Sequence, residues 1–281
     1  MKILVLNGSP KGDLSVTMQF VAFMAKMNPQ HNLKIINIAQ QIRHIEHDGQ
    51  KFDEVMAEIE TADGVLWAFP LYVFLVHSHY KRFIELIFER NKTEVFRDKY
   101  TAVFSTSIHF FDHTAHQYMR EICDDLNMCF CDSFSAGMRD LFKPVERENL
   151  LHFFSGFLAA IQRKAPCVKL VNPLETNNPE FIPGEAVVTP FVHSRSIVIV
   201  TDAEATQVNL LRMIDRFAAQ FAERPQVVNL RQVEIKGGCL GCIRCGYDNH
   251  CAYTGRDAFI DMFNRLKPAD ILGFAGAIRD R

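Results

Sequence analysis

The sequence predicts an α/β fold built on a doubly wound parallel sheet. Three observations favour this fold class: segments typical of strands and helices alternate over residues 1–164, a glycine turn follows the first apolar strand, and the pattern of that strand returns at residues 196–201. The chain has 281 residues, of which 48% are hydrophobic and 23% charged. This balance is ordinary for globular domains and excludes a disordered or collagen-like chain.

Five strands, each followed by a helix, are expected in residues 1–164. Apolar or alternating runs predict strands at residues 3–6, 34–38, 64–69, 101–105 and 128–134. Large apolar residues at helical spacing predict helices at residues 16–27, 52–59, 80–88, 115–126 and 146–161. Right-handed crossovers leave few topologies, of which the flavodoxin-like order is the commonest for five strands. We therefore expect residues 1–164 to form a flavodoxin-like domain.

Residues 165–193 interrupt this alternation. They contain five prolines, which favour an extended linker over a helix or a sheet strand. After this linker, residues 196–201 (SIVIVT) match residues 2–7 (KILVLN), and residues 259–270 match residues 52–63. The offsets of the two matches are 194 and 207, so the later segment holds 13 extra residues between them. We therefore expect residues 194–281 to be an incomplete second flavodoxin-like copy.

The end of the second copy leaves a question about its sheet edge. Under the second offset, Arg281 corresponds to Phe74, so the second copy has no counterpart of the last two strands of the first. Its third strand, residues 271–274, would then be an open apolar edge, which natural proteins rarely leave bare. Either the chain is a fragment of a longer protein or another surface covers this edge.

Charge and hydropathy exclude several classes of partner. Lys and Arg number 31 against 33 Asp and Glu, which gives a formal net charge of -2 and no basic surface for nucleic acid. Apolar runs such as residues 64–69 are far shorter than the roughly 20 residues of a membrane span. The apolar run at residues 2–6 is too short for a secretory signal. We expect a cytoplasmic protein that binds neither nucleic acid nor membrane.

The loop after the first strand has the composition of a phosphate-binding turn. Residues 7–17 contain two glycines, hydroxyls at Ser9, Ser15 and Thr17, and the start of a helix whose amides favour an anion. The spacing fits neither a P-loop nor a dinucleotide fingerprint. A plain strand-to-helix turn is the alternative. Loops after the third and fourth strands, residues 69–74 and 105–111, lie where open α/β sheets bind ligands, and their aromatic residues either wall a flat ring or pack beneath the loops.

Two of these loops resemble the NADPH-dependent FMN reductase family of flavodoxin-like proteins. Residues 6–11 (LNGSPK), 62–65 (ADGV) and 69–72 (FPLY) are similar to the family pattern LNGSPR…SNT followed by ADGIVFGSPVYFG. The resemblance implies that residues 1–164 bind FMN. It assigns the FMN phosphate to Ser9, Lys11, Ser15, Val16 and Thr17, the flavin ring to Pro70, Leu71, Tyr72 and Val73, and the opposite loop to Thr106, Ser107 and His109. Val16 departs from the usual asparagine, and the loop after the fourth strand is bulkier than is usual.

Four cysteines lie within thirteen residues of the second copy. Cys239, Cys242, Cys245 and Cys251 have the spacing C-x2-C-x2-C-x5-C, which suits a [4Fe-4S] cluster, although four thiolates can also bind zinc. An empty motif and the absence of any metal are the remaining alternatives. The segment at residues 238–255 also resembles the iron–sulfur flavoprotein family, which carries such a motif after its second strand. In contrast, residues 202–207 lack glycine and add two carboxylates, so no second phosphate site is expected.

The remaining cysteines and histidines carry weaker signals. Cys129 and Cys131 lie on one side of a predicted strand and are expected to be small buried thiols. His109, His113 and His116 have helical spacing and are expected on a solvated helix face.

These observations predict an FMN-dependent NAD(P)H oxidoreductase. It would pass electrons to a small-molecule or protein acceptor, with a [4Fe-4S] cluster as a candidate relay. The alternatives are an iron–sulfur flavoprotein that carries electrons without a substrate of its own, and a zinc-holding binding module without flavin. We expect the chain to form a homo-oligomer.

Overall fold

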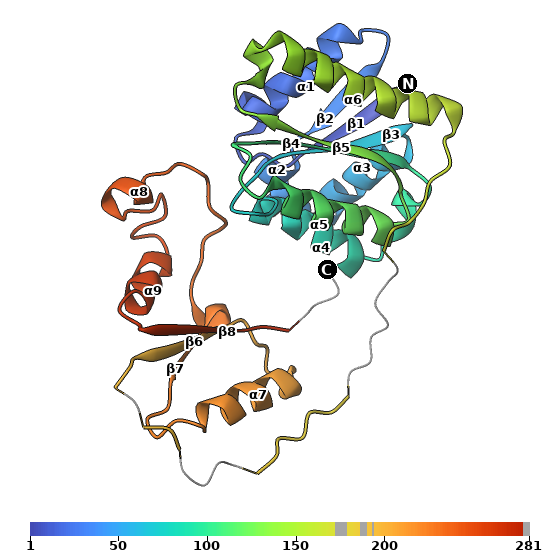
Figure 1. The fold of residues 1–281 in the computed structure, drawn as a ribbon. Coiled ribbons are helices and arrows are strands. Elements are labelled where there is room, and N and C mark those ends of the chain that lie inside the picture. The colour runs from blue at the N-terminus through green and yellow to red at the C-terminus, as the bar shows by residue number, and fades with distance from the viewer. Residues whose placement is uncertain (172–178, 186–189, 193, 278–281) are drawn as a thin grey trace. The chain divides into compact units, whose positions relative to one another are not determined.

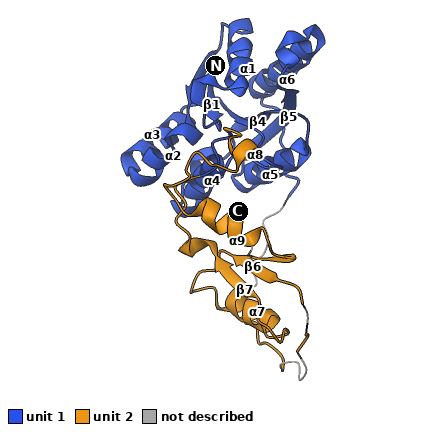
Figure 2. Cartoon of the chain, turned by 90° about the vertical axis from the view of Figure 1, so that its left-hand side faces the viewer, with its two compact units in different colours: residues 1–174, 238–241 blue, residues 175–237, 242–281 orange. Residues whose placement is uncertain are grey.

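The computed structural model of the chain describes residues 1–171, 179–185, 190–192 and 194–277 (Figure 1). The chain divides into two compact units (Figure 2). Unit 1 comprises residues 1–174 with 238–241, and unit 2 comprises residues 175–237 with 242–281. No helix among the described residues is both long enough and apolar enough to cross a membrane.

Unit 1 contains the five-stranded parallel sheet that the sequence predicts. Its strands are β1 (Lys2–Asn7), β2 (Asn32–Ile36), β3 (Gly64–Pro70), β4 (Tyr100–Ser107) and β5 (Cys129–Gly137). They lie in the order β2-β1-β3-β4-β5, and every neighbouring pair is parallel. This is the flavodoxin-like order, so the predicted fold class is confirmed.

Helices cover both faces of this sheet (Figure 1). On one face lie α1 (Val16–Met27) and α6 (Pro144–Arg163). On the other lie α2 (Ile38–His47), α3 (Gly49–Glu60), α4 (Ser78–Glu89) and α5 (Asp112–Asp125). Short 3-10 turns are η1 (Gly12–Leu14), η2 (Thr93–Phe96) and η3 (Asp140–Phe142). The sequence prediction missed α2, whose buried residues Ile38, Ile42 and Ile45 follow helical spacing.

The core of unit 1 has two layers, one on each face of the sheet. The middle strands are buried on both faces, which explains their nearly continuous apolar sequences. Trp67, the only tryptophan in the chain, is fully buried on β3. Its ring stacks on Phe96 at a centroid distance of 5.9 Å and meets Tyr80 edge-on at 5.8 Å. These aromatic contacts fix β3 against η2 and α4.

Unit 2 has a smaller sheet of three parallel strands. They are β6 (Ile197–Thr201), β7 (Gln226–Asn229) and β8 (Ile271–Ala275), in the order β7-β6-β8. The helical elements of this unit are α7 (Val208–Ala218), η4 (Leu230–Gln232), α8 (Cys245–Asp248) and α9 (Phe259–Leu266). In the described parts of residues 165–193, the structure has no helix or strand beyond a bridge between Phe191 and Phe221.

Each unit makes the same pair of hydrogen bonds at the start of its own central strand. In unit 1, the Lys2 amide donates to Asp63 Oδ2 at 2.8 Å, and the Asp63 amide donates to the Lys2 carbonyl at 2.9 Å. In unit 2, Ser196 and Asp270 make the same pair of bonds at 2.7 and 3.0 Å. The order β7-β6-β8 also corresponds to β2-β1-β3. The two sequence matches therefore fall on equivalent places in the two sheets.

Candidate functional site

Three loops of unit 1 leave the carboxyl ends of β1, β3 and β4, which are consecutive strands in the sheet. They are the phosphate loop (residues 8–15), the β3–α4 loop (residues 71–77) and the β4–α5 loop (residues 108–111). Open α/β sheets bind ligands at this edge. The predicted flavin-site residues lie in these loops or at the ends of the elements that flank them.

The phosphate loop is a compact turn held by its own polar groups. The Ser9 amide donates to Asn7 Oδ1 at 2.9 Å, and Ser9 Oγ accepts from the Lys11 amide at 3.2 Å. Gly12 has a φ of +56°, which a residue with a side chain rarely adopts. Lys11 is exposed beside this turn. The loop is therefore shaped by backbone geometry, with one lysine at its surface.

Gly8 lets this loop lie directly on the neighbouring strand. Its amide donates to the Ala68 carbonyl at 2.7 Å. A Cβ at this position would come within 2.8 Å of Phe69 Cβ and of the Tyr80 ring. Tyr80 also donates its hydroxyl to the Leu6 carbonyl at 2.7 Å, which fixes the wall that Gly8 touches. No larger residue fits here without displacing the loop.

The start of α1 points its first amides toward the phosphate loop. Ser15 is the N-cap, and its Oγ accepts from the Met18 amide at 3.2 Å. Val16 and Thr17 are the first two helical residues, so their amides have no intrahelical carbonyl to bind. Helix N-termini of this kind favour anions. The predicted residues Ser15, Val16 and Thr17 are thus placed at the positive end of a helix.

The loop also contains an acidic group that the sequence analysis did not weigh. Asp13 accepts from Asn37 Nδ2 at 3.2 Å, and Asn37 Oδ1 accepts from Asn7 Nδ2 at 2.7 Å. This chain of hydrogen bonds joins η1 to the ends of β1 and β2. The carboxylate of Asp13 is held by this chain at the outer side of the turn.

Thr17 and Thr106 join the phosphate loop to β4. Their hydroxyl oxygens are 2.7 Å apart, and both side chains are buried. The sequence assigned these two residues to opposite ends of a ligand site, whereas the structure brings them into contact. Each hydroxyl therefore already has one hydrogen-bond partner inside the protein.

The β3–α4 loop continues the sheet and then turns sharply. Pro70 is the last residue of β3, and the Leu71 amide donates to the Thr106 carbonyl at 3.0 Å. Tyr72 and Leu75 exchange two backbone hydrogen bonds of 2.9 and 3.1 Å. Val73, at the tip of this turn, has a φ of 38° and is 80% exposed. The turn places the tip beyond the edge of the sheet.

The β4–α5 loop is held by polar contacts at its base. Ser107 Oγ accepts from the His109 amide at 2.8 Å, and His109 Nδ1 lies 3.0 Å from Asp112 Oδ2. Asp112 also accepts from Ser135 Oγ at 2.6 Å. Burial raises the pKa of Asp112, but the hydrogen bonds from Ser135 and His109 outweigh it and lower the pKa to about 2. Asp112 is therefore ionised near neutral pH. Ser135 was not among the predicted site residues.

Three phenylalanines connect the β3–α4 and β4–α5 loops. The rings of Phe74 and Phe111 meet edge-on at 4.8 Å, and Phe110 lies 5.6 Å from Phe74. All three are between 40% and 54% exposed. Phe74 and Phe111 have positive φ values of 72° and 56°, so the loops hold these residues in an unfavourable backbone conformation. The result is an aromatic surface at the carboxyl edge of the sheet.

The family comparison bears on this set of loops. Residues 1–139 match the family described as NADPH-dependent FMN reductase. The first domain belongs to this family. It is therefore a domain of the NADPH-dependent FMN reductases, and the resemblance seen in residues 6–11 and 62–72 is confirmed. The match contains the phosphate loop, the β3–α4 loop and the β4–α5 loop of the FMN reductase domain.

Several solved structures are similar to the FMN reductase domain in fold. One is an NADH:FMN oxidoreductase in its apo form, with 15% identity, 57% of this chain and 89% of that chain covered, and a TM-score of 0.49. Another is FerB, an NAD(P)H:acceptor oxidoreductase from Paracoccus denitrificans, with 16% identity, 58% and 97% covered, and a TM-score of 0.49. A third is an FMN-dependent NADH-azoreductase from Bacillus anthracis in complex with FMN, with 17% identity, 59% and 99% covered, and a TM-score of 0.41. No curated protein matches the chain.

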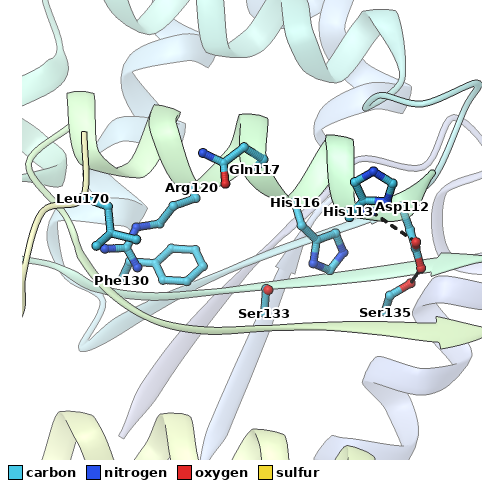
Figure 3. A pocket seen from close by; sticks show the side chains of 9 residues that line it. All are labelled: Asp112, His113, His116, Gln117, Arg120, Phe130, Ser133, Ser135 and Leu170. Atoms are coloured by element: carbon cyan, nitrogen blue, oxygen red, sulfur yellow. Dashed lines mark hydrogen bonds between the residues drawn. The ribbon is translucent and has the colours of Figure 1, made fainter. Parts of the chain in front are cut away.

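A cavity lies between α5 and β5, next to the β4–α5 loop (Figure 3). Its volume is about 470 Å³. Asp112 and Ser135 lie at one end, and Arg120, Phe130 and Leu170 at the other. The Arg120 guanidinium lies 4.3 Å from the centre of the Phe130 ring. The lining residues are Asp112, His113, His116, Gln117, Arg120, Phe130, Ser133, Ser135 and Leu170.

His116 lines this cavity but is not on a solvated helix face as expected. Its Nε2 lies 2.7 Å from Ser105 Oγ, and Ser105 is fully buried on β4. Burial lowers the pKa of His116, although Asp112 and Asp132 act in the opposite direction. The imidazole is therefore held neutral near pH 7. The sequence spacing did not reveal this, because the depth of a helical position depends on the strand packed beneath it.

The cysteine motif is not assembled as a metal site among the described residues. Cys239, Cys242 and Cys245 are exposed, and Cys251 is half-buried. Within the described part of the chain, no three histidine, cysteine or acidic side chains are grouped so that they could hold a metal ion. Cys239 falls in unit 1 and the other three cysteines in unit 2. No electron step is assigned to these thiols.

Proposed function

We propose that the chain is an FMN-dependent NAD(P)H oxidoreductase whose flavin is held by unit 1. The observation that carries this proposal is the joint placement of a glycine-containing turn, the N-terminus of α1 and an aromatic surface at the carboxyl edge of the sheet. The family match adds the reaction class. When bound, FMN would accept a hydride from NAD(P)H and release the electrons to an acceptor.

The residues of the phosphate loop fit an anionic phosphate. Amides at the start of α1 and the hydroxyls of Ser9 and Ser15 are donors, and Lys11 adds a positive charge. Gly8 keeps the backbone close to β3, so this end of the site is shaped before any ligand arrives. We assign the phosphate to Ser9, Lys11, Ser15, Val16 and Thr17 on this basis.

The other end of the site would receive the flavin ring. The assigned residues are Pro70, Leu71, Tyr72, Val73, Thr106, Ser107 and His109. Phe74, Phe110 and Phe111 offer apolar surface next to them, and the Asp112 carboxylate holds His109 at the base of the loop. These rings would exclude water from one side of a bound flat ligand.

Comparison of FMN with riboflavin tests the division between the two ends. Lys11→Gln should weaken FMN binding about tenfold, a loss of about 1.4 kcal/mol, and leave riboflavin binding unchanged. Fluorescence titration of the full chain measures both affinities, and anaerobic addition of NADPH should then bleach the bound FMN. Equal loss of FMN and riboflavin affinity would contradict the assignment of Lys11. A chain that binds no FMN would overturn the proposed function itself.

The spacing of the four cysteines supports a second candidate, an iron–sulfur flavoprotein that carries electrons without a substrate of its own. C-x2-C-x2-C-x5-C suits a [4Fe-4S] cluster, with zinc as the alternative. Iron, sulfide and zinc analysis of the purified chain separates these cases. Cys242→Ala should remove any cluster absorbance and leave bound FMN in place. A metal-free protein that NADPH bleaches would eliminate the electron carrier and retain the oxidoreductase.

We also infer that residues 194–281 are a second flavodoxin-like copy that has lost its phosphate site. Under the first offset, Asp202 stands where unit 1 has Gly8, and Ala203 stands where it has Ser9. Glu204, in the same turn, forms an ion pair with Arg231 at 2.6 Å. An acidic turn without glycine disfavours a second phosphate. One FMN per chain is the expected stoichiometry.

A further inference from the structure

Two cysteines outside the flavin site form a disulfide in unit 1. Cys129 begins β5, and Cys167 lies in the segment that follows α6. Their Cα atoms are 5.2 Å apart, which is within the usual range for a disulfide, and the two residues are 38 positions apart in the sequence. The expectation that Cys129 is an unpaired buried thiol was therefore wrong. Proximity of this kind depends on where the chain goes after α6, which the sequence pattern did not reveal.

The disulfide ends in a segment that lies against the outer edge of the sheet. We call this segment, residues 165–171, the strap. Non-covalent contacts also hold it: the Tyr100 hydroxyl donates to the Ala165 carbonyl at 3.0 Å, and Arg120 Nη2 donates to the Val168 carbonyl at 2.6 Å. The strap has no helix or strand of its own. Its position thus depends on side chains of β4, α5 and β5.

Asp124 is the main non-covalent anchor of the strap. Its side chain is 1% exposed, and its Oδ2 accepts from the Leu170 and Val171 amides at 3.0 and 3.2 Å. Arg120 Nε lies 3.4 Å from the same oxygen. A buried carboxylate needs such donors, because its charge is costly to bury without them. The strap and Asp124 therefore stabilise each other at residues 170 and 171, which follow Cys167 in the strap.

Unit 1 has four cysteines that lie close together in sequence or space, and the disulfide joins two of them. The other two, Cys123 and Cys131, are free. Burial raises the pKa of Cys131 to about 11, and burial also raises the pKa of Cys123 well above its usual value. Both therefore remain protonated and react poorly, since the thiolate is the reactive form. Cys167 is exposed on the strap, so an external thiol can reach it. Exchange at the Cys129–Cys167 pair is favoured for these reasons.

We propose that Cys129 and Cys167 are a redox-controlled fastening for the strap. A dithiol reductant breaks the Cys129–Cys167 S–S bond, both sulfurs gain an electron and a proton, and the reductant becomes a disulfide. The strap is then held by non-covalent contacts, with Asp124, Arg120, Tyr100 and Asn127 as its partners. Leu170 forms part of the wall of the α5–β5 cavity, so release of the strap widens that cavity. This device is independent of flavin binding.

Peptide mapping tests the existence of the pair in the full-length protein. After equilibration with oxidised glutathione and alkylation, tryptic peptides 121–139 and 165–169 should be found linked, and dithiothreitol should separate them. Cys129→Ser and Cys167→Ser should abolish the link, whereas the matched control Cys131→Ser should retain it. Complete alkylation of both Cys129 and Cys167, or glutathione adducts in place of the link, would overturn the proposal.

Limited proteolysis tests the fastening. Trypsin should cut after Lys169 about tenfold faster in the reduced protein than in the oxidised protein, because the strap opens more often when only non-covalent contacts hold it. Cleavage after Arg231 in unit 2 is the internal reference. Cys167→Ser should cut at the reduced rate in both buffers, and Cys131→Ser should still respond to redox state. Equal rates for oxidised and reduced wild-type protein would show that the disulfide does not control the strap.

Discussion

The two parallel sheets start from equivalent strands and reach different degrees of burial. In unit 1, β1 and β3 are covered by helices on both faces, and buried clusters lie on each side. In unit 2, the buried cluster that the structure describes consists of Ile199, Ala203, Ile214 and Ala218. Phe274 on β8 is 80% exposed, whereas β3, in the equivalent position, is almost fully buried. Equivalent strands therefore acquire a core only where further elements cover them.

This difference shows what the shared sequence pattern encodes. The apolar run, the polar residue at its end and the aspartate before the third strand place β6 and β8 as they place β1 and β3. Thr201 Oγ1 even accepts from the Ala203 amide at 3.1 Å, as Asn7 Oδ1 accepts from the Ser9 amide. The same short sequence pattern therefore accompanies the same strand pairing in both units. The free energy of burial depends on the elements that follow.

The largest expected effect is the loss of stability of unit 1 when Ile3, on its central strand, is shortened. Ile3→Ala should lower the free energy of unfolding of unit 1 by about 2–5 kcal/mol, because Ile3 is fully buried in its core. Urea titration followed by fluorescence measures this change, since the only tryptophan, Trp67, reports on unit 1.

The matched variant is Ile197→Ala, which removes the equivalent side chain from β6. It should leave the Trp67 transition unchanged, because Ile197 lies in unit 2. A shift of the Trp67 midpoint as large as that of Ile3→Ala would mean that the two units unfold together, and the contrast drawn above would fail.

An intermediate effect is expected at the turn after the central strand. Gly8→Ala places a Cβ 2.8 Å from Phe69 Cβ and should cost unit 1 about 1–3 kcal/mol by overpacking. It should also weaken FMN binding, because the phosphate loop must shift. Asp202→Ala, at the equivalent position of unit 2, should change stability by no more than about 0.5 kcal/mol. Similar costs at both positions, measured by urea titration followed by far-UV circular dichroism, which reports on both units, would show that the turns are packed alike.

The smallest expected effect is a pH dependence that arises from His116. Burial lowers its pKa in the folded state, so the unfolded state binds more protons as the pH falls below about 6.5. Its contribution to stability is complete above that pH and is lost as the pH falls toward the folded pKa. His116→Gln should therefore reduce the difference in unfolding free energy between pH 7 and pH 5 by less than about 1 kcal/mol.

The sequence predicted the features that depend on local pattern. The five strands of unit 1 and their order followed from apolar runs and crossover rules, and the ligand loops followed from the carboxyl ends of β1, β3 and β4. The missed helix α2 follows directly after β2, and its spacing at Ile38, Ile42 and Ile45 was visible in the sequence. Polar residues separate these three isoleucines, so the helix has no continuous apolar run.

Features that join distant segments could not be predicted in the same way. The Cys129–Cys167 pair depends on the path of the strap, and the burial of His116 depends on Ser105 beneath it. The contact between Phe74 and Phe111 depends on two loops that each adopt positive φ values. Hydrophobic periodicity carries no information about such contacts, because each is set by the packing of one element on another.

The aspartate before the third strand has a consequence for protein engineering. Asp63 and Asp270 each close onto the backbone at the start of their own central strand, with nearly the same two hydrogen bonds. Each therefore marks a joint at the same place in the two sheets. A chimera that continues residues 194–270 with residues 64–164 retains this joint and supplies the second sheet with a fourth and a fifth strand.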